Sequence, residues 1–267
     1  MLPNLAHIYG PLYLNCYGLA IALGFLLLRY LLIKAPQRPA LLTVNQLDTL
    51  LIYSMPIAVL GGRLLWAVGE LATAKSLSAL AREFFALWEP GYSVLGAFLA
   101  ILIFVPLYLH TQRIPVLKFL DLVAIYNPLF HAIARVGCFL AGCCHGLPTN
   151  LPWGVTYTHP DVLVPGCLKF IPLHPTQLYS AALLFVTFLF MYFCAQHKFK
   201  HPGQLLGIYL VLAGLERFMV DFWRADRELL LNCPLGLQQL IALGIVLGGL
   251  ALLIYTKNSQ RSRWRAG

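Results

Sequence analysis

Long apolar stretches separated by short polar connections recur seven times along the chain. Each has about the 20 residues that a helix needs to cross the hydrocarbon layer of a bilayer. The strict alternation of apolar and polar residues that marks the strands of a membrane β-barrel is not found. The sequence therefore predicts an all-α polytopic membrane protein, a single integral membrane domain over 1–267 with seven transmembrane helices. These are expected at roughly 13–33, 47–69, 91–109, 117–140, 177–195, 203–222 and 236–255.

Composition supports a membrane location and excludes other classes of protein. Of the 267 residues, 60% are hydrophobic and only 11% are charged, whereas about 25% are charged in a soluble globular domain. This balance excludes both a soluble globular domain and a disordered chain. The formal net charge is +9, but no basic groove with interleaved aromatic residues accompanies it, so no nucleic-acid partner is expected. The partner that this charge favours is an anionic lipid bilayer.

The distribution of Lys and Arg predicts the orientation in the membrane. The first, third and fifth connections between spans, together with the basic tail at 256–267, hold more of these residues than the other connections. Cytoplasmic loops of membrane proteins carry an excess of Lys and Arg. We therefore expect the N-terminus outside and the C-terminus in the cytoplasm.

Two long connections lie on the predicted outer side. In 70–90, four large apolar residues share one helical face, which predicts either an amphipathic helix in the membrane interface or a loop helix packed on the protein. Residues 144–176 are rich in Pro, Thr and Gly and lack clear periodicity. Unstructured connections of that length are typical of functional lids. Both segments are interpreted as insertions into the membrane domain.

Four arginines stand inside predicted spans, where a charge is costly unless it has a partner or a function. Arg29 lies in the cytoplasmic half of the first span, and we expect its charged head to reach the surface. Arg63, Arg135 and Arg217 each fall in the outer part of a span, at the predicted depth of Tyr17 in the first span. Their shared depth predicts an outer-leaflet site where guanidinium groups bind a lipid phosphate. Arg135 has no carboxylate nearby in its helix and is the better candidate. Arg63 is either a ligand or a packed residue whose charged head reaches the surface.

The sixth span carries a charged pattern of its own. Arg217, Asp221 and Arg224 stand at i, i+4 and i+7 in GLERFMVDFWR, which places them on one helical face. One interpretation is that Asp221 only neutralises Arg217 so that the helix can insert. The other is that Asp221 orients the Arg217 fork toward a lipid phosphate.

Polar residues at the start of the fifth span are candidates for proton transfer and binding. His174 begins HPTQLYS at the predicted outer surface, beside Gln177 and Tyr179. It is either a helix-entry residue that makes a hydrogen bond to the backbone or a general base. His145, at the membrane edge, has the same two interpretations.

The cysteines on the outer side permit disulfides, because that compartment is oxidising. A bridge from Cys167 to Cys143 or Cys144 is plausible, although the sequence leaves the pairing open and Cys233 is a further candidate. A metal site is a further interpretation of the cysteine-rich stretch, with Cys138, Cys143, Cys144 and His145 as possible ligands. Their spacing matches no standard zinc knuckle, so neither a metal nor another cofactor is predicted.

Several motifs taken together resemble the prolipoprotein diacylglyceryl transferase family. They are RVGCFLAGCCHGLPTNLPWGV, then HPTQLY, then GLERFMVDFWR, preceded by Tyr17-Gly18-Leu19 and Gly61-Gly62-Arg63-Leu64. Their order and rough spacing match the family from about residue 10 to about residue 230. Members of that family are seven-helix inner-membrane enzymes with the N-terminus outside, in agreement with the orientation expected above.

The resemblance implies a reaction and its partners. Such enzymes transfer the diacylglyceryl group of phosphatidylglycerol to the lipobox cysteine thiol in the signal peptide of a prolipoprotein and release glycerol 1-phosphate, without metal or organic cofactor. The reaction is part of lipoprotein biosynthesis in the bacterial inner membrane, at its outer leaflet. Expected catalytic residues are Arg217, Asp221 and His174; expected substrate-binding residues are Arg135, Tyr17, Arg63, Gly137, Gly142, Gln177 and Tyr179.

The sequence departs from the family pattern at several polar positions. Leu95 stands at the position of a histidine in the third span, and Ser180 replaces the glutamate that commonly follows QLY. Cys138, Ala141 and Cys143 replace two asparagines and a glutamate of the signature. Three hypotheses follow besides a little-supported transporter: a divergent transferase, a paralogue that uses phosphatidylglycerol with another acceptor, and a non-catalytic phospholipid-binding protein.

Overall fold

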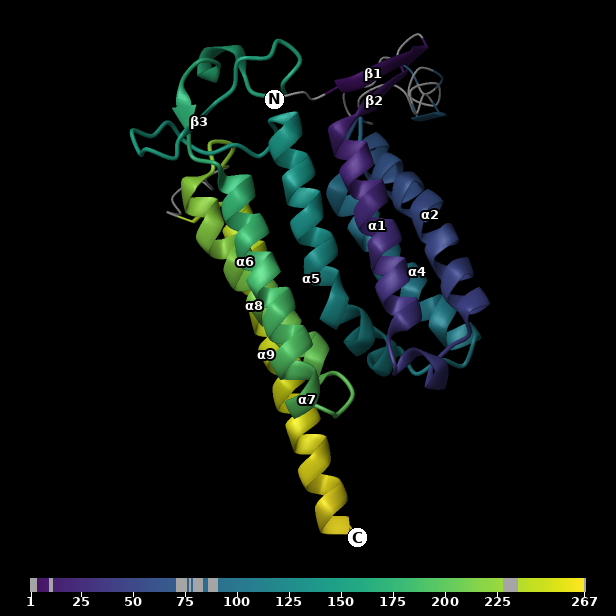
Figure 1. Cartoon of the computed structure of the whole chain (residues 1–267). Coiled ribbons are helices and arrows are strands. Elements are labelled where there is room, and N and C mark those ends of the chain that lie inside the picture. Colours follow the sequence, from purple (N-terminus) through teal and green to yellow (C-terminus); the bar gives the residue numbers. More distant parts are fainter. Residues whose placement is uncertain are drawn as a thin grey trace. The chain divides into compact units, whose positions relative to one another are not determined.

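The computed structural model describes residues 4–9, 12–70, 76, 78, 84–85, 91–227 and 235–266, and most of these are helical. The chain divides into two compact units. The first comprises Met1–Lys34 and Leu120–Gly267, and the second comprises Ala35–Phe119. The units are described separately below (Figure 1). The amphipathic helix expected within 70–90 lies almost entirely outside the described residues.

Within the part of the chain that the structure describes, six helical segments are long and apolar enough to cross a membrane. Several of their large apolar side chains, such as Leu26 and Phe193, are more than half exposed, as expected of surfaces that contact lipid rather than water. These segments confirm six of the seven expected spans within a few residues. They are α1 (Cys16–Lys34), α2 (Val44–Glu70), α4 (Val94–Thr111), α5 (Val116–Ala141), Thr176–Lys198 and Leu237–Asn258.

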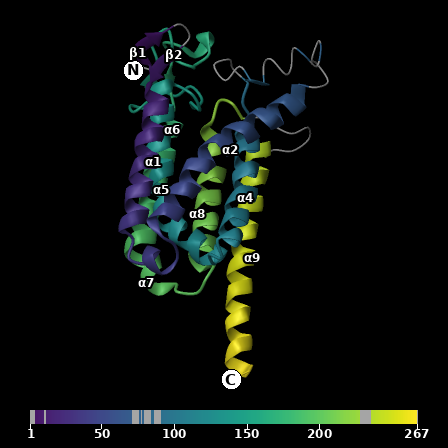
Figure 2. The same cartoon turned by 90° about the vertical axis from the view of Figure 1, so that its right-hand side faces the viewer.

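The fifth of these segments is not a uniform α-helix. It is α6 (Thr176–Phe190), followed by the π-helical turn η3 (Met191–Ala195) and the short α7 (Gln196–Lys198). The last segment is the first part of α9 (Leu237–Ala266). In both views α9 extends past the ends of α6 and α8 toward the C-terminus (Figures 1 and 2).

The expected span 203–222 is observed as α8 (Gln204–Val220), whose 17 residues are followed by the 3-10 turn η4 (Asp221–Trp223). In the first unit α8 packs against both α6 and α9. A Cβ on Gly249 would lie only 2.8 Å from the Gly207 carbonyl oxygen. Such small residues let membrane helices approach closely. A polar contact adds to this packing, because the Asn127 side chain of α5 donates to the Tyr209 hydroxyl at 2.8 Å.

The N-terminal end of the first span differs from the sequence prediction. Strands β1 (Asn4–Tyr9) and β2 (Leu12–Asn15) pair antiparallel, and α1 begins at Cys16 rather than near residue 13. Asn15 sets this start, because its Oδ1 accepts a hydrogen bond from the Gly18 N–H at 2.6 Å. Asn is a favoured N-cap residue, since its side chain satisfies an N–H that has no partner within the helix.

Residues 142–176 are folded and carry an apolar core of their own, unlike the connection without regular structure that the sequence predicts. Strands β3 (Val155–Thr156) and β4 (Pro172–Leu173) pair antiparallel, and the 3-10 turn η2 (Gly166–Leu168) lies between them. Tyr157, Val162, Val164 and Leu173 form the buried cluster. We call this segment the outer cap. Its strands and core hold the chain that links α5 to α6 in a defined conformation.

The second unit is built on the contact of α2 with α4. Gly61 and Gly96 permit this contact, because a Cβ on Gly96 would lie 2.3 Å from the Gly61 carbonyl oxygen. The short 3-10 turn η1 (Arg38–Ala40) precedes α2. The Tyr92 hydroxyl donates to the Ala58 carbonyl at 3.3 Å and further joins the segment before α4 to α2.

A buried carboxylate of α5 caps the N-terminus of α8. The two Asp121 oxygens accept hydrogen bonds from the N–H groups of Gly203 at 2.6 Å and Leu206 at 2.7 Å. Asp121→Ala leaves both donors without this partner at the positive end of a helix. We expect a loss of about 1–3 kcal/mol in the free energy of unfolding, measured by thermal unfolding in detergent. The exposed Asp161→Ala is the control and should leave the midpoint unchanged.

Candidate functional site

Charged side chains gather in the first unit where α5 and α8 end. Arg135 of α5, Arg217 of α8 and Arg224 after η4 are near enough for their positive charges to act on one another. Glu216 and Asp221 are buried beside them, at 5% and 1% exposure. Five charged groups in so little water require either mutual pairing or an ionic ligand. The site is therefore a candidate for anion binding.

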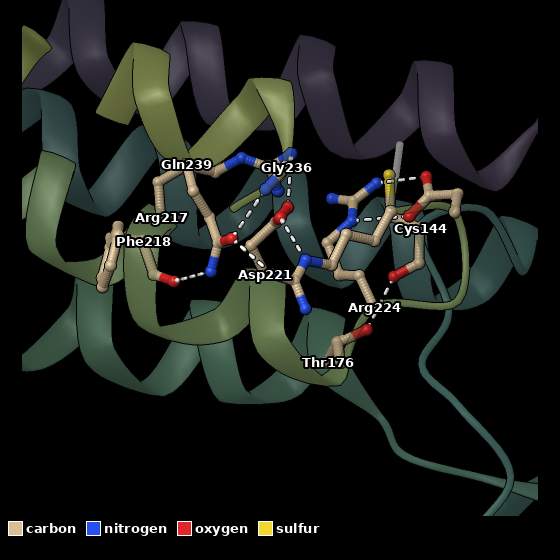
Figure 3. Close-up of polar contacts among 10 residues, drawn as sticks. Cys144, Thr176, Arg217, Phe218, Asp221, Arg224, Gly236 and Gln239 are labelled. Carbon is tan, nitrogen blue, oxygen red and sulfur yellow. Dashed lines mark hydrogen bonds and ion pairs between the residues drawn. The ribbon is translucent and has the colours of Figure 1, made fainter. Parts of the chain in front are cut away.

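Asp221 neutralises part of this charge. It lies 3.3 Å from the Arg217 guanidinium and 3.9 Å from that of Arg227 (Figure 3). Neither carboxylate oxygen accepts a hydrogen bond from the residues that the structure describes. The Arg217–Asp221 pair expected from the i, i+4 spacing is thus present. Attraction between charges, more than hydrogen bonding, holds Asp221 in place.

The expected third member of that helical face is elsewhere. α8 ends at Val220 and η4 turns the chain, so Arg224 does not continue the face of Arg217 and Asp221. Its guanidinium instead pairs with Asp226 through two hydrogen bonds, one of 2.7 Å from Nε. The single-face prediction is therefore wrong for Arg224, because it assumed a helix that continues beyond residue 220.

Arg135 has the property expected of an anion ligand. Its Nε is buried and has no hydrogen-bond partner among the described residues, although a buried donor without a partner is costly. The Arg135 charge acts on Tyr17, on Glu216 and on Cys144. A phosphate oxygen would satisfy both the charge and the open donor.

Tyr17 approaches this site from α1. Gly137 permits the approach, because a Cβ at residue 137 would lie 2.8 Å from the Ala20 Cβ and 3.4 Å from the Tyr17 Cα. Tyr17 is 42% exposed, so its ring remains accessible beside Arg135. Two residues that were expected near Arg135 from the sequence, Tyr17 and Gly137, are therefore brought to it.

Glu216 is a member of the site that the sequence analysis missed. It is almost fully buried in α8. Its carboxylate lies within hydrogen-bonding reach of Ser180 in α6, and the Arg135 charge acts on it electrostatically. The signal was present, since Glu216 is an acidic residue in a span directly before Arg217. Ser180, which stands at a family glutamate position, thus lies against a carboxylate supplied by the neighbouring helix.

A tight turn follows α5. Gly142 has φ +80° and Cys144 has φ +58°, a left-handed backbone that suits glycine but is uncommon for cysteine. Two nearly fully buried side chains of α6 fix the turn. Gln177 Nε2 donates to the Cys143 carbonyl at 2.7 Å. The Thr176 hydroxyl donates to the Cys144 carbonyl, also at 2.7 Å (Figure 3).

Gln177 and the outer cap share a further contact. Gln177 Nε2 also donates to the Tyr157 hydroxyl at 3.2 Å. Burial raises the pKa of Tyr157 to about 12, against the opposing effect of this hydrogen bond. The Tyr157 phenol therefore stays neutral at physiological pH and serves as a fixed anchor for Gln177.

The cysteines of the turn are free thiols, and so is the exposed Cys167. The disulfide expected from Cys167 to Cys143 or Cys144 is therefore not formed, because the cap holds Cys167 at its surface. Cys233 lies outside the described residues. Hydrogen bonds from the Cys138 and Cys143 thiols hold the pKa of Cys144 below its ordinary value.

His174 and Tyr179 lie in an aromatic cluster. The His174 Nδ1 is 3.2 Å from the Tyr179 hydroxyl, which also accepts a hydrogen bond from the Trp153 ring nitrogen at 2.9 Å. The Tyr179 ring packs edge-on against Trp223. His145 is buried, with its Nδ1 3.3 Å from the Gly142 carbonyl. Among the residues that the structure describes, the hydrogen-bonding partner of the His174 side chain is thus a phenol rather than the backbone.

Gly146 joins three segments at the edge of the site. Its N–H donates to the His174 carbonyl at 3.0 Å, and a Cβ would lie 2.5 Å from the His174 Cβ and 2.7 Å from the Trp223 carbonyl oxygen. Gly146→Ala should therefore lower the thermal midpoint, with about 1–3 kcal/mol lost to overpacking. Gly166→Ala, where a Cβ meets nothing within 4 Å, is the matched control. Equal midpoints in the two variants would contradict the close approach.

Arg63 belongs to the second unit. It is 3% exposed, and its guanidinium lies over the Trp66 ring, 5.5 Å from the centroid. Gly91, with φ +130°, leaves room for it, since a Cβ there would lie 2.9 Å from Arg63 Nη1. The expectation that the Arg63 head reaches the surface is therefore wrong. A cation–π contact lowers the cost of burying this charge.

These features define a class of protein, a multi-pass membrane protein with buried arginines around a fixed turn. Residues 3–255 match the prolipoprotein diacylglyceryl transferase family. The chain belongs to this family of transferases, which confirms the resemblance drawn from the motifs.

Three curated relatives illustrate the similarity, and each is named phosphatidylglycerol–prolipoprotein diacylglyceryl transferase. The one from Clostridium tetani is 32% identical over 226 residues, covering 85% of this chain and 86% of the relative. The one from Bordetella bronchiseptica is 31% identical over 253 residues and 92% of each chain. The one from Zymomonas mobilis is 30% identical over 266 residues, covering 96% of this chain and 89% of the relative.

Proposed function

We propose that this protein transfers the diacylglyceryl group of phosphatidylglycerol to the lipobox cysteine thiol of prolipoproteins. Membership of the family and the names of its relatives support this reaction. The observation that carries the site assignment is Arg135, a half-buried cation whose buried Nε lacks a partner among the described residues.

Arg135 and Arg217 are assigned to the phosphate of the lipid. Two guanidinium forks hold the phosphodiester and stabilise the charge that develops on the leaving glycerol phosphate as the acceptor sulfur attacks. Asp221 orients Arg217 through the 3.3 Å ion pair. Tyr17, Gly137, Gly142, Gln177 and Tyr179 are assigned to the walls of the substrate site. The phosphate contact of Arg63, which belongs to the second unit, stays a prediction from the sequence.

The acceptor thiol must lose its proton to become a nucleophile. Leu95, at the family's histidine position, cannot accept it. His174 or His145 is the base in one version of the proposal. In the other, no base is required, because the positive field of the arginines lowers the pKa of the bound thiol and favours its thiolate.

The topology proposed for this reaction has seven spans. α8 is the seventh, because its 17 residues, most of them apolar, and the turn η4 together approach the length of a crossing. With the N-terminus outside and the C-terminus in the cytoplasm, the arginine site faces the outer leaflet of the bacterial inner membrane. There it meets phosphatidylglycerol and the signal peptides of exported prolipoproteins. No metal or organic cofactor takes part in the proposed transfer.

The test is direct. The purified protein is incubated with labelled phosphatidylglycerol and a lipobox peptide, and both the peptide mass and the release of glycerol phosphate are followed. A diacylglyceryl adduct on the peptide cysteine supports the proposal. Glycerol phosphate release without an adduct would indicate another acceptor, and lipid binding with neither product would indicate a non-catalytic protein.

A further inference from the structure

Three cysteine sulfurs meet beside the arginine site. Cys138 lies in the last turns of α5, whereas Cys143 and Cys144 lie in the turn that follows. The three Sγ atoms are all within 4.8 Å of one another. Three sulfurs at about 2.3 Å from one metal ion lie ~4 Å apart in a trigonal arrangement. The cluster therefore needs to contract by less than 1 Å to enclose an ion.

The backbone holds these sulfurs in place. Cys144 keeps its left-handed conformation although such a conformation costs about 1 kcal/mol or more for a residue with a Cβ. Gln177 and Thr176, each 1% exposed, fix the carbonyls of Cys143 and Cys144. The carbonyls are thus bound from α6 while the side chains remain beside Cys138. Metal ligands are typically held in position by hydrogen bonds from residues that do not themselves bind the metal.

The surrounding charge suits a metal–thiolate complex. Three thiolates around a monovalent or divalent ion leave a net negative charge, and Arg135 and Arg224 both act electrostatically on Cys144. They offset part of that charge in a site where little water reaches. A ligand set made only of sulfur selects soft ions, such as Cu(I) or Zn(II), over Mg(II) or Ca(II).

We propose that Cys138, Cys143 and Cys144 form a three-coordinate site for Cu(I). Zn(II) in proteins is almost always four-coordinate, and among the described residues the ligand group contains these three cysteines only. The nearby His145 turns its Nδ1 toward the Gly142 carbonyl. The sequence spacing matches no zinc knuckle, but the folded turn brings the three sulfurs together in a different arrangement.

The test is an anaerobic titration of the reduced full-length protein in detergent with Cu(I), in competition with a chromophoric Cu(I) chelator. We expect one Cu(I) per chain and an X-ray absorption spectrum of three sulfur neighbours. Cys143→Ser removes one ligand without changing the carbonyl that Gln177 binds, and should weaken Cu(I) binding at least ~10-fold. Cys194→Ser removes an exposed thiol outside the cluster and should leave binding unchanged.

Several results would overturn the proposal. The first is that the folded wild-type protein binds no Cu(I). The second is that Cys143→Ser and Cys194→Ser bind Cu(I) equally well. The third is that a parallel titration with Zn(II) gives stoichiometric binding while Cu(I) does not bind. A disulfide within the cluster in the protein isolated without reductant, detected by mass spectrometry, would also replace the metal site with a redox pair. If Cys143→Ser lowers the thermal midpoint, Cys144→Ser is titrated in its place. The titration needs no lipid, so its failure is separate from failure of the transferase proposal.

Discussion

Arg135→Ala is expected to abolish diacylglyceryl transfer while the protein still inserts and folds. The Nε of Arg135 is a buried donor with no partner among the described residues. Removing the Arg135 side chain therefore removes a phosphate ligand without breaking a hydrogen bond that Nε makes within the protein. Loss of a charge-stabilising donor costs about 10²–10³-fold in rate. The measurement is peptide adduct formed per minute with purified protein at saturating phosphatidylglycerol and lipobox peptide.

A second substitution tests the geometry of the contact. Arg135→Lys keeps the charge but lacks the planar fork, so we expect it to recover little of the lost rate. Arg29→Ala, an arginine of α1 outside the cluster, is the control and should retain full activity. Full activity in Arg135→Ala, or full rescue by lysine, would show that Arg135 does not bind the phosphate through its fork.

The pair Arg217–Asp221 should separate a structural role from a catalytic one. Arg217→Ala leaves the 1% exposed Asp221 with Arg227 at 3.9 Å. We expect loss of transfer and up to about 3–5 kcal/mol of destabilisation, because a buried charge loses its closer partner. The double variant Arg217→Ala/Asp221→Ala removes both charges and should recover most of the thermal stability while remaining inactive.

The double variant distinguishes the two interpretations of Asp221. If Asp221 serves only to neutralise Arg217 for insertion, and Arg217 has no substrate to bind, then the double variant recovers activity together with stability. Recovery of the thermal midpoint without recovery of adduct formation supports a phosphate ligand oriented by a carboxylate. Both quantities come from the same purified samples, by differential scanning fluorimetry and by peptide mass.

The helices followed from sequence because the length of an apolar run is a property of the chain itself. The start of α1 did not, because apolar residues such as Leu12 and Leu14 fit a strand as well as a helix. The fold of the outer cap was also missed. Its core packs Tyr157 together with Leu173, 16 positions further along the chain. A contact between residues so far apart in sequence cannot be predicted from the local pattern of apolar and polar residues.

The site was predicted where spacing along one helix decides the geometry. Arg217 and Asp221 are four residues apart and meet as expected. Arg224 was misplaced because α8 ends at Val220 and the 3-10 turn η4 follows. Glu216 points about 100° away from Arg217 on the helix. It belongs to the site because α6 packs against α8 and places Ser180 beside the Glu216 carboxylate. The thiol cluster likewise depends on a left-handed Cys144 that no sequence pattern signals.

The outer cap also provides a natural place to attach a reporter. Cys167 is an exposed free thiol within η2, next to a glycine around which there is open space. Because the cap has its own apolar core, a maleimide dye or spin label on that sulfur should sit on a firm support without disturbing the arginines. In intact cells, a reagent that cannot cross the bilayer would react there only if the cap lies outside. Because Cys194 is also an exposed free thiol, the labelled residue is identified by mass spectrometry, and an adduct on Cys167 then gives the orientation of the unmodified chain.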